Sequence, residues 1–207
     1  MLNEYVENRA GQPEKWLRLL MYIAIATLVN TAISFLPVVP AVLTSWIARG
    51  IMVAMIVCMF RLAPVNARYR KAGIMRTVIL ACTLITAFIS GTSLLNVAAS
   101  ILSIVAGYQE YSAHSELIAD KDAKLSGKWH SLFNWSIATG LLLGFGTAVA
   151  VLLLTLMEMD VVGVTALVVG ILSVPQMILN LVYAMYIKKT ISALENTAGK
   201  SFEALCE

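Results

Sequence analysis

The chain has 207 residues, of which 59% belong to the apolar set AVILMFWYC and only 13% are charged, and its mean hydropathy is +0.82. Soluble domains carry roughly 25% charged residues, and a soluble chain of this size cannot hide so many apolar side chains from water. These values exclude a water-soluble globule, a disordered chain and a disulfide-stapled secreted scaffold. The net charge of +3 is too small for a basic nucleic-acid surface, so no nucleic acid is expected as a partner.

The first 15 residues mix acidic and basic side chains, whereas a cleavable signal begins with a purely basic segment. They are expected to stay as a cytoplasmic N-terminal segment, and the apolar run at about 16–36 is expected to be a retained first span. LPVVP at 36–40 ends this run, because proline stops a helix. A second span is expected at about 41–60.

Residues 77–110 form a long stretch in which the first charged residue is Glu110. As one helix it would measure about 50 Å at 1.5 Å per residue, well beyond a hydrocarbon core of ~30 Å. The small polar residues at 90–93 are typical of a turn and divide the stretch into spans of about 74–90 and 94–111. One long tilted helix is the alternative.

The remaining third of the chain is expected to hold a polar loop and two further spans. Residues 112–130 are predicted to be a cytoplasmic loop, in which 116–125 can form a helix on the membrane surface. The next spans are expected at about 131–157 and 161–187, followed by a cytoplasmic tail at 190–207.

The distribution of basic residues favours six spans with both termini in the cytoplasm. With this count, Arg49 is the only one of the 15 Lys and Arg residues outside the inner segments. Five spans would place Lys188, Lys189 and the lysines of 121–128 outside, against the positive-inside rule. The expected fold is therefore an all-α bundle of six transmembrane helices, spanning residues 16–189, in the cell (inner) membrane.

Arg49 lies within the second span, where an arginine costs about 2.5–3.5 kcal/mol unless it is paired or faces a cavity. It is predicted to contact an anionic group of a substrate. The alternative is a position near the outer interface, where it pairs with Glu158 or Asp160. Further polar residues at similar depth, or beside the helix-kinking Pro175, are expected to line an outward-facing pocket with Arg49; they are Asn30, Asn96, Ser100, Gln176 and Asn180.

A polar stripe follows one face of the fourth span, with members three or four residues apart. Tight helix packing is the favoured interpretation and a water-lined path is the alternative. Glu110 and His114 end the stripe and are predicted to form an inner gate or proton site. Nearby acids suit a divalent cation, but lysines interleave with them, so a solvated surface helix is favoured and no metal or cofactor is expected. The stripe consists of Asn96, Ser100, Ser103, Gly107, Glu110 and His114.

Gly140 and Gly144 form a G-x-x-x-G motif in the fifth span, which is typical of close helix packing within one chain or between copies. The motif predicts a homo-oligomer or a membrane complex as one possibility. The three cysteines form no C-x-x-C pair and are expected to be free thiols.

Three functions remain open from the sequence. The leading hypothesis is that the protein binds or transports a small solute or ion through the outward-facing pocket. The second is an interaction or scaffold subunit whose cytoplasmic segments (61–76, 112–130 and 190–207) dock a partner. The third, which is less favoured, is a membrane enzyme acting on lipid, for which no catalytic residue is identified.

Overall fold

In the computed structural model, residues 13–36, 38–89, 93–156 and 161–203 are described, although side chains are not described at 93, 161–167 and 197–203. The described residues form helices joined by short connections and contain no strand. The helices are α2 (Pro13–Ser34), α3 (Ala41–Leu62), α4 (Ala67–Phe88), α5 (Ser93–Ile118), α6 (Ala123–Leu156) and α7 (Val161–Glu203).

Several helix starts have a local cause in the sequence. Pro40 precedes α3 in an extended conformation, with φ −60° and ψ 130°. Asn66 caps α4, since its side-chain oxygen accepts a hydrogen bond from the backbone N–H of Arg68 at 2.8 Å. Asp122 caps α6 in the same way, through the N–H of Leu125 at 2.9 Å. Each cap satisfies a backbone donor that the helix itself leaves unpaired.

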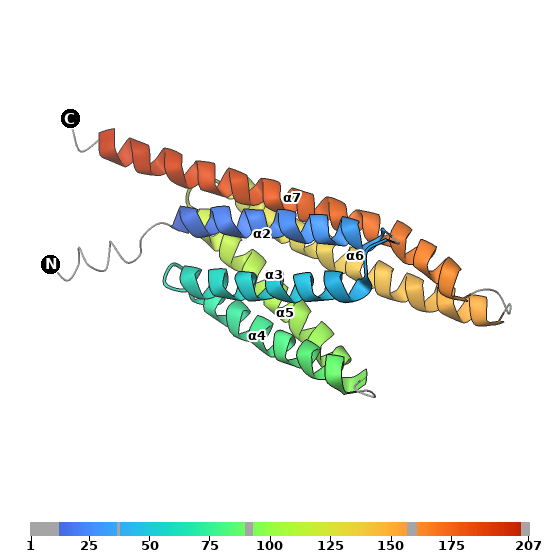
Figure 1. Cartoon of the computed structure of the whole chain (residues 1–207). Helices are drawn as coiled ribbons and strands as arrows, with labels where there is room; N and C mark the ends of the chain where they lie inside the picture. Colours follow the sequence, from blue (N-terminus) through green and yellow to red (C-terminus); the bar gives the residue numbers. More distant parts are fainter. Residues whose placement is uncertain (1–12, 37, 90–92, 157–160, 204–207) are drawn as a thin grey trace.

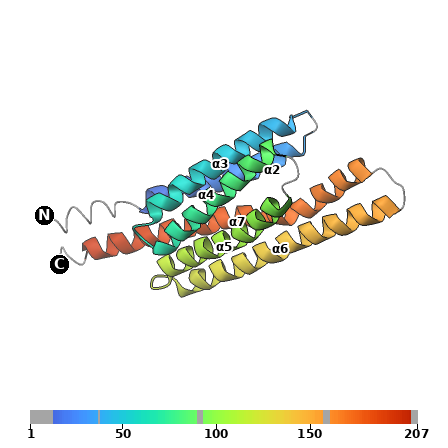
Figure 2. The ribbon, with the colours of Figure 1, turned by 90° about the horizontal axis from the view of Figure 1, so that it is seen from below.

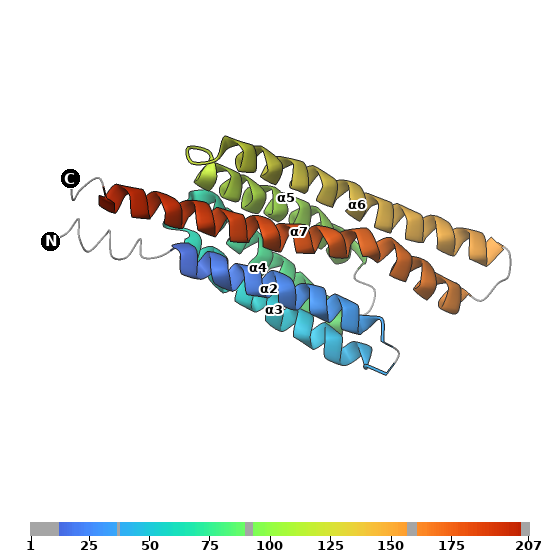
Figure 3. The ribbon, with the colours of Figure 1, turned by 90° about the horizontal axis from the view of Figure 1, so that it is seen from above.

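Consecutive helices run up and down and pack in chain order, and α7 also packs against α2, so the six helices form a closed ring (Figure 1). α5 additionally touches α7 across the ring. Viewed from above, α7 lies between α2 and α6 on the near face (Figure 3). This arrangement brings α4, α5, α6 and α7 together around one interior.

The two ends of the bundle differ. We call the end that contains the first residues of α2 and the connections 63–66 and 119–122 the closed end, and the opposite end the splayed end. The helices lie together at the closed end and diverge toward the splayed end (Figures 1 and 2). The main buried cluster lies in the closed-end half and includes Leu20, Met59, Tyr69, Trp129 and Ile187.

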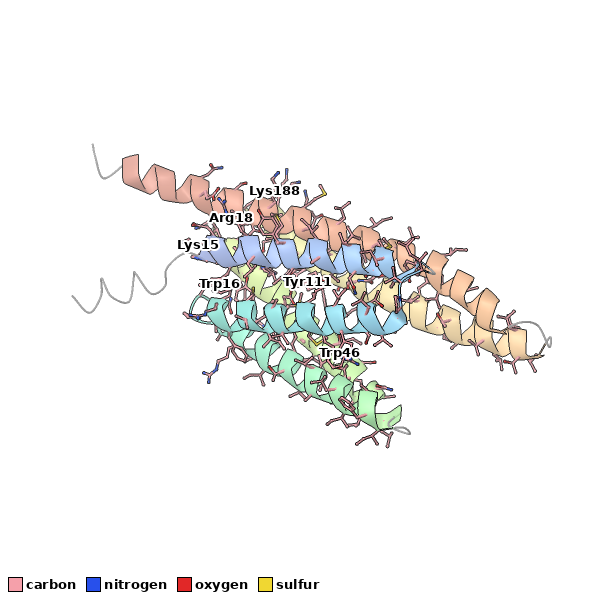
Figure 4. All side chains as sticks on the ribbon, viewed as in Figure 1. Lys15, Trp16, Arg18, Trp46, Tyr111 and Lys188 are labelled. Carbon is pink, nitrogen blue, oxygen red and sulfur yellow. The ribbon has the colours of Figure 1, made fainter. Side chains whose placement is uncertain are left out.

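Five helices are long and apolar enough to cross a membrane by length and composition: α2, α3, α4, α6 and residues Val168–Asn196 of α7. α5 is not among these five helices, because the side chains of the polar stripe lower its mean hydropathy. Basic side chains gather at the closed end, as Lys15, Arg18 and Lys188 illustrate (Figure 4). Arg49, in contrast, lies in the splayed-end half of α3.

The stretch 77–110 contains two helices, because α4 ends at Phe88 and α5 begins at Ser93; the single long helix is wrong. Residues 112–130 differ from the expected loop, since only 119–122 lie between α5 and α6. The reason is packing: Ser112 and Ser115 are buried. The Ser115 hydroxyl also hydrogen-bonds that of Ser126 at 2.8 Å, which ties the end of α5 to the start of α6.

Gly73 in α4 is one of the closely packed glycines of the described chain, and Gly146 in α6, where a Cβ would lie 2.9 Å from Leu172 Cδ1 of α7, is another. A Cβ atom at Gly73 would lie 3.3 Å from Met59 Cβ of α3. At Gly140 and Gly144 an added Cβ would meet nothing within 4 Å. The G-x-x-x-G motif therefore does not pack within this chain, and its contact with a second copy stays a prediction.

Candidate functional site

Glu110 and His114, the residues predicted as a gate or proton site, are both buried in the closed-end half, with exposed fractions of 1% and 0%. Glu110 forms an ion pair with Arg76 of α4 and accepts a hydrogen bond from the hydroxyl of Tyr183 of α7. A carboxylate held by both groups keeps α4 and α7 attached to α5 at this level.

His114 lies between two tyrosine hydroxyls. Its Nδ1 is 2.8 Å from the hydroxyl of Tyr69 and its Nε2 is 3.3 Å from that of Tyr183. The imidazole also stacks on Trp129 of α6, with ring centroids 4.5 Å apart and an interplanar angle of 24°. We call these residues together the buried polar cluster: Tyr69, Arg76, Glu110, His114, Trp129 and Tyr183.

The hydrogen bonds assign a direction to the protons of this cluster. Tyr183 has one hydroxyl proton and donates it to Glu110, so it can only accept from His114 Nε2. In the neutral imidazole, the Nδ1 atom of His114 then accepts from Tyr69. The result is a continuous row of donors from Tyr69 through His114 and Tyr183 to the carboxylate of Glu110.

The buried polar cluster lies a short way inside the basic rim of the closed end. Arg76 is six residues beyond Arg70 in α4, which is about 9 Å along the helix. Tyr183 precedes Lys188 by five residues in α7, or about 8 Å. The Arg76 side chain is 19% exposed, and its Nε atom has no hydrogen-bond partner in the described part of the chain.

A cleft of about 350 Å³ opens between α5 and α6 on the splayed side of the buried polar cluster, and we call it the α5–α6 cleft. Its closed-end wall contains Tyr111, whose ring packs against those of Tyr183 at 5.5 Å and Trp129 at 5.9 Å. Tyr111 thus separates the cleft from the cluster. The lining contains no charged side chain and consists of Ser100, Ser103, Ile104, Gly107, Tyr111, Phe133, Ser136, Ile137, Gly140 and Leu141.

A second polar network lies outside the core at the closed end. Glu116 accepts hydrogen bonds from Arg68 Nε at 2.7 Å and from Asn66 Nδ2 at 2.9 Å. The hydrogen bond from Asn66, together with that from Arg68 and its positive charge, holds the pKa of Glu116 below its usual value. The side chain of Glu116 is 47% exposed. This network ties the start of α4 to the end of α5.

The residues predicted to share one outward-facing pocket lie at separate places. Arg49 stacks on Trp46 at 4.6 Å and lines a cleft between α3 and α4 that includes Phe88. Asn30 donates to the carbonyl of Thr44 at 3.3 Å, so it joins α2 to α3.

The other predicted pocket residues belong to α5 and α7. Asn96 and Ser100 are exposed on α5, and the Ser100 hydroxyl donates to the carbonyl of Asn96 at 2.9 Å. Gln176 accepts from Thr139 of α6 at 3.1 Å, and Asn180 is half-buried on α7. Of the six predicted residues, Ser100 alone lines the α5–α6 cleft. A single pocket around Arg49 therefore stays a prediction.

Arg49 has no ion pair with any residue that the structure describes. Its alternative partners, Glu158 and Asp160, lie outside the described residues.

Sequence reasoning did not find Arg76 as the partner of Glu110. The available signal was the depth of the two residues in the membrane. Each is the charged residue deepest inside its expected span, the two spans are neighbours, and the two charges are opposite. Tyr69, Trp129 and Tyr183 carried no such signal, since aromatic residues near a membrane interface are common.

Comparison with known proteins gives no relative: no family model, no curated protein and no solved structure matches this chain. Within the described residues, no group of three or more His, Cys, Asp or Glu side chains is arranged to hold a metal ion. Cys58 and Cys82 are free thiols.

Proposed function

We propose that this chain is a membrane carrier that binds a small uncharged solute in the α5–α6 cleft and couples its passage to protonation of Glu110. One observation carries the proposal. The buried ion pair of Arg76 and Glu110 and the row of hydrogen bonds that leads to it lie directly behind Tyr111, which forms the closed-end wall of the cleft. Ionisable residues inside membrane helices mark ion or substrate paths by default, because burying them in an apolar medium is costly.

The proposal includes six spans and a cytoplasmic closed end. α5 has 26 residues, about 39 Å, and it lies against α4 and α6, which are both apolar enough to span. Because α5 begins at the splayed end of α4 and ends at the closed end of α6, it crosses the same thickness of membrane as these two helices. The basic residues of the closed end support a cytoplasmic position for this end, by the positive-inside rule.

The lining of the α5–α6 cleft favours an uncharged solute with hydroxyl or carbonyl groups and an apolar body. Serine and tyrosine hydroxyls supply donors and acceptors, whereas Ile104, Phe133 and Leu141 supply apolar surface. An anion would find no positive side chain in this cleft. Arg49, the anion contact expected from the sequence, lines a different cleft.

Protonation of Glu110 is the proposed switch. The charged carboxylate holds both Arg76 and Tyr183, and this keeps the closed end shut. A proton on the carboxylate removes the charge that holds Arg76 and weakens the hydrogen bond accepted from Tyr183, so α4 and α7 are held less tightly to α5 at this level. The row from Tyr69 through His114 and Tyr183 is oriented to pass a proton toward Glu110.

Cysteine accessibility tests this arrangement in cells and in inside-out vesicles, starting from a chain whose three native cysteines are replaced. Ser103→Cys, in the cleft, is expected to react with an impermeant thiol reagent added from outside. Ala106→Cys, one turn away and 0% exposed, is its matched control and is expected to stay unlabelled.

The switch is tested at Ala113, which is buried at the closed end. Glu110→Gln imitates the protonated carboxyl, so Ala113→Cys should react from the cytoplasmic side in the Glu110→Gln background and stay protected with Glu110 present. Equal labelling of Ala113→Cys in the two backgrounds, or no labelling of Ser103→Cys, would contradict the carrier.

A further inference from the structure

A continuous apolar stripe runs along the side of α7 that faces away from the bundle. Its five members recur every three or four residues, so they lie on one face of the helix. The stripe rises over about 21 Å, more than the roughly 15 Å of one membrane leaflet. Its members are about half exposed or more: Ile171 64%, Val174 50%, Ile178 55%, Leu181 49% and Met185 49%.

A cleft of about 540 Å³ lies at the closed-end limit of this stripe. Lys188 and Lys189 contribute two positive charges to it, and neither forms an ion pair with a residue that the structure describes. Lys188 lies on the outer side of α7 (Figure 4). The remaining lining residues are Asp122, Met185, Ser192, Ala193 and Asn196.

Asp122 is the single acidic residue of this cleft, and its side chain is already engaged as the N-cap of α6. Its Oδ1 accepts the N–H of Leu125 at 2.9 Å, at the positive N-terminal end of the α6 dipole. With both lysines the cleft keeps a formal charge of +1, which matches the single negative charge of a phosphodiester. Asn196 is exposed and adds an amide donor at the same place.

We propose that the stripe and the cleft together bind one anionic phospholipid, with the phosphate at Lys188 and Lys189 and an acyl chain along the stripe. The order of the features matches that of the ligand: a cationic cleft at the membrane surface continues directly into an apolar face that reaches toward the membrane centre. This site is separate from the α5–α6 cleft and does not depend on the carrier function.

The test uses the full chain purified in a neutral detergent and measures binding by native mass spectrometry and by the thermal unfolding midpoint. The probes are phosphatidylglycerol, phosphatidylcholine with the same chains, and glycerol phosphate without chains. Phosphatidylglycerol is expected to bind and to raise the midpoint, while the other two leave it unchanged. Equal effects of the two lipids would overturn the role of charge, and an equal effect of glycerol phosphate would overturn the role of the acyl chain.

Two double variants locate the site. Lys188→Gln with Lys189→Gln is expected to weaken phosphatidylglycerol binding roughly 25-fold, a factor of about five for each lysine. Arg70→Gln with Lys71→Gln removes an adjacent, exposed basic pair from α4 at the same end and is expected to leave binding unchanged. Equal losses in both variants would overturn the site, because a general basic surface would then explain the binding.

Discussion

The closed and splayed ends of this bundle contain similar helices but pack very differently. At the closed end His114, Trp129 and Tyr69 are fully buried. At the splayed end Leu94 and Phe88 are exposed by 84% and 78%. Lipid covers apolar side chains as well as protein does, so apolar residues alone do not draw membrane helices together. Contacts become specific where polar side chains need partners, and the largest group of such side chains in the described residues, the buried polar cluster, lies in the closed-end half.

Several hydroxyl groups toward the splayed end donate to backbone carbonyls of their own helix. Thr27 donates to the carbonyl of Ile23 at 2.9 Å, and Thr147 donates to that of Leu143 at 2.7 Å. A hydroxyl can therefore remain in an apolar span without a neighbouring helix. Arg76 and Glu110 have no such local solution, and each requires the other.

The largest effect is expected from breaking the ion pair of the buried polar cluster. Arg76→Gln leaves Glu110 buried without its positive partner, and loss of one member of a buried pair costs about 3–5 kcal/mol. We expect a large fall in the thermal unfolding midpoint in detergent, measured by circular dichroism. Ser100→Ala, at an exposed site toward the splayed end, is the comparison and should change the midpoint little.

The double variant Arg76→Gln with Glu110→Gln sharpens this comparison. Both charges are removed together, so it should recover a large part of the stability that Arg76→Gln loses. Additive losses in the double variant would mean that the two side chains act independently, and the ion pair would not be what holds the closed end.

A smaller effect is expected from adding volume at a glycine. Gly73→Val places carbon atoms against Met59, where a Cβ already lies at 3.3 Å, and overpacking of this kind costs about 1–3 kcal/mol. Gly144→Ala meets nothing within 4 Å and should stabilise α6 by up to about 1 kcal/mol through helix propensity. The unfolding midpoints of both variants check this.

The result at Gly144 also tests the predicted contact between copies. If Gly144→Ala instead lowers stability and a dimer is lost in light scattering, then the G-x-x-x-G motif packs against a second chain. Unchanged mass and a raised midpoint would contradict that contact.

The six helices of the described residues could be predicted from the sequence because hydropathy, proline and charge each report on single segments. The division into α4, which ends at Phe88, and α5, which begins at Ser93, was predictable on the same ground, since the stretch is too long for one membrane crossing. The partners of Glu110 were not, because pairing depends on which helices are neighbours in the ring. Hydropathy also could not reveal that 112–118 continues α5, since its burial comes from tertiary packing against α6.

The candidate site was predicted in part for a related reason. Glu110 and His114 stood out because ionisable side chains are rare inside spans, and the structure places them in one cluster. The predicted pocket residues were selected by depth alone, which does not specify the side of the helix they face. Asn30, for example, binds the neighbouring α3 backbone at Thr44.

An effect of about 1 kcal/mol is expected from Thr190→Val. The Thr190 hydroxyl accepts the indole N–H of Trp129 at 3.3 Å, and both residues are fully buried. The nearly isosteric valine leaves that N–H without a partner while the ring stacking on His114 is kept. Ser192→Ala, an exposed hydroxyl bonded only to its own helix, is the matched control for the unfolding midpoint. A loss as small as that of the control would mean that the indole finds another acceptor.

The smallest effect is expected at the exposed network of the closed end. The pKa of Glu116 is lower in the folded chain than in the unfolded chain, where it is about 4.3. Glu116 therefore stabilises the fold at a pH above about 4.3, and this contribution is lost as the pH falls through the folded pKa. Glu116→Gln should therefore lower the free energy of unfolding at pH 7 by at most about 1 kcal/mol, which is seen as a slightly lower unfolding midpoint. In acid, the difference between the variant and the unmodified chain should vanish. If Glu116→Gln loses as much stability at pH 7 as Arg76→Gln does, then the location of an ion pair at the closed end decides how much it stabilises the fold. A small loss that disappears in acid would show that burial decides it, because both ion pairs join the same two helices and differ mainly in their exposure.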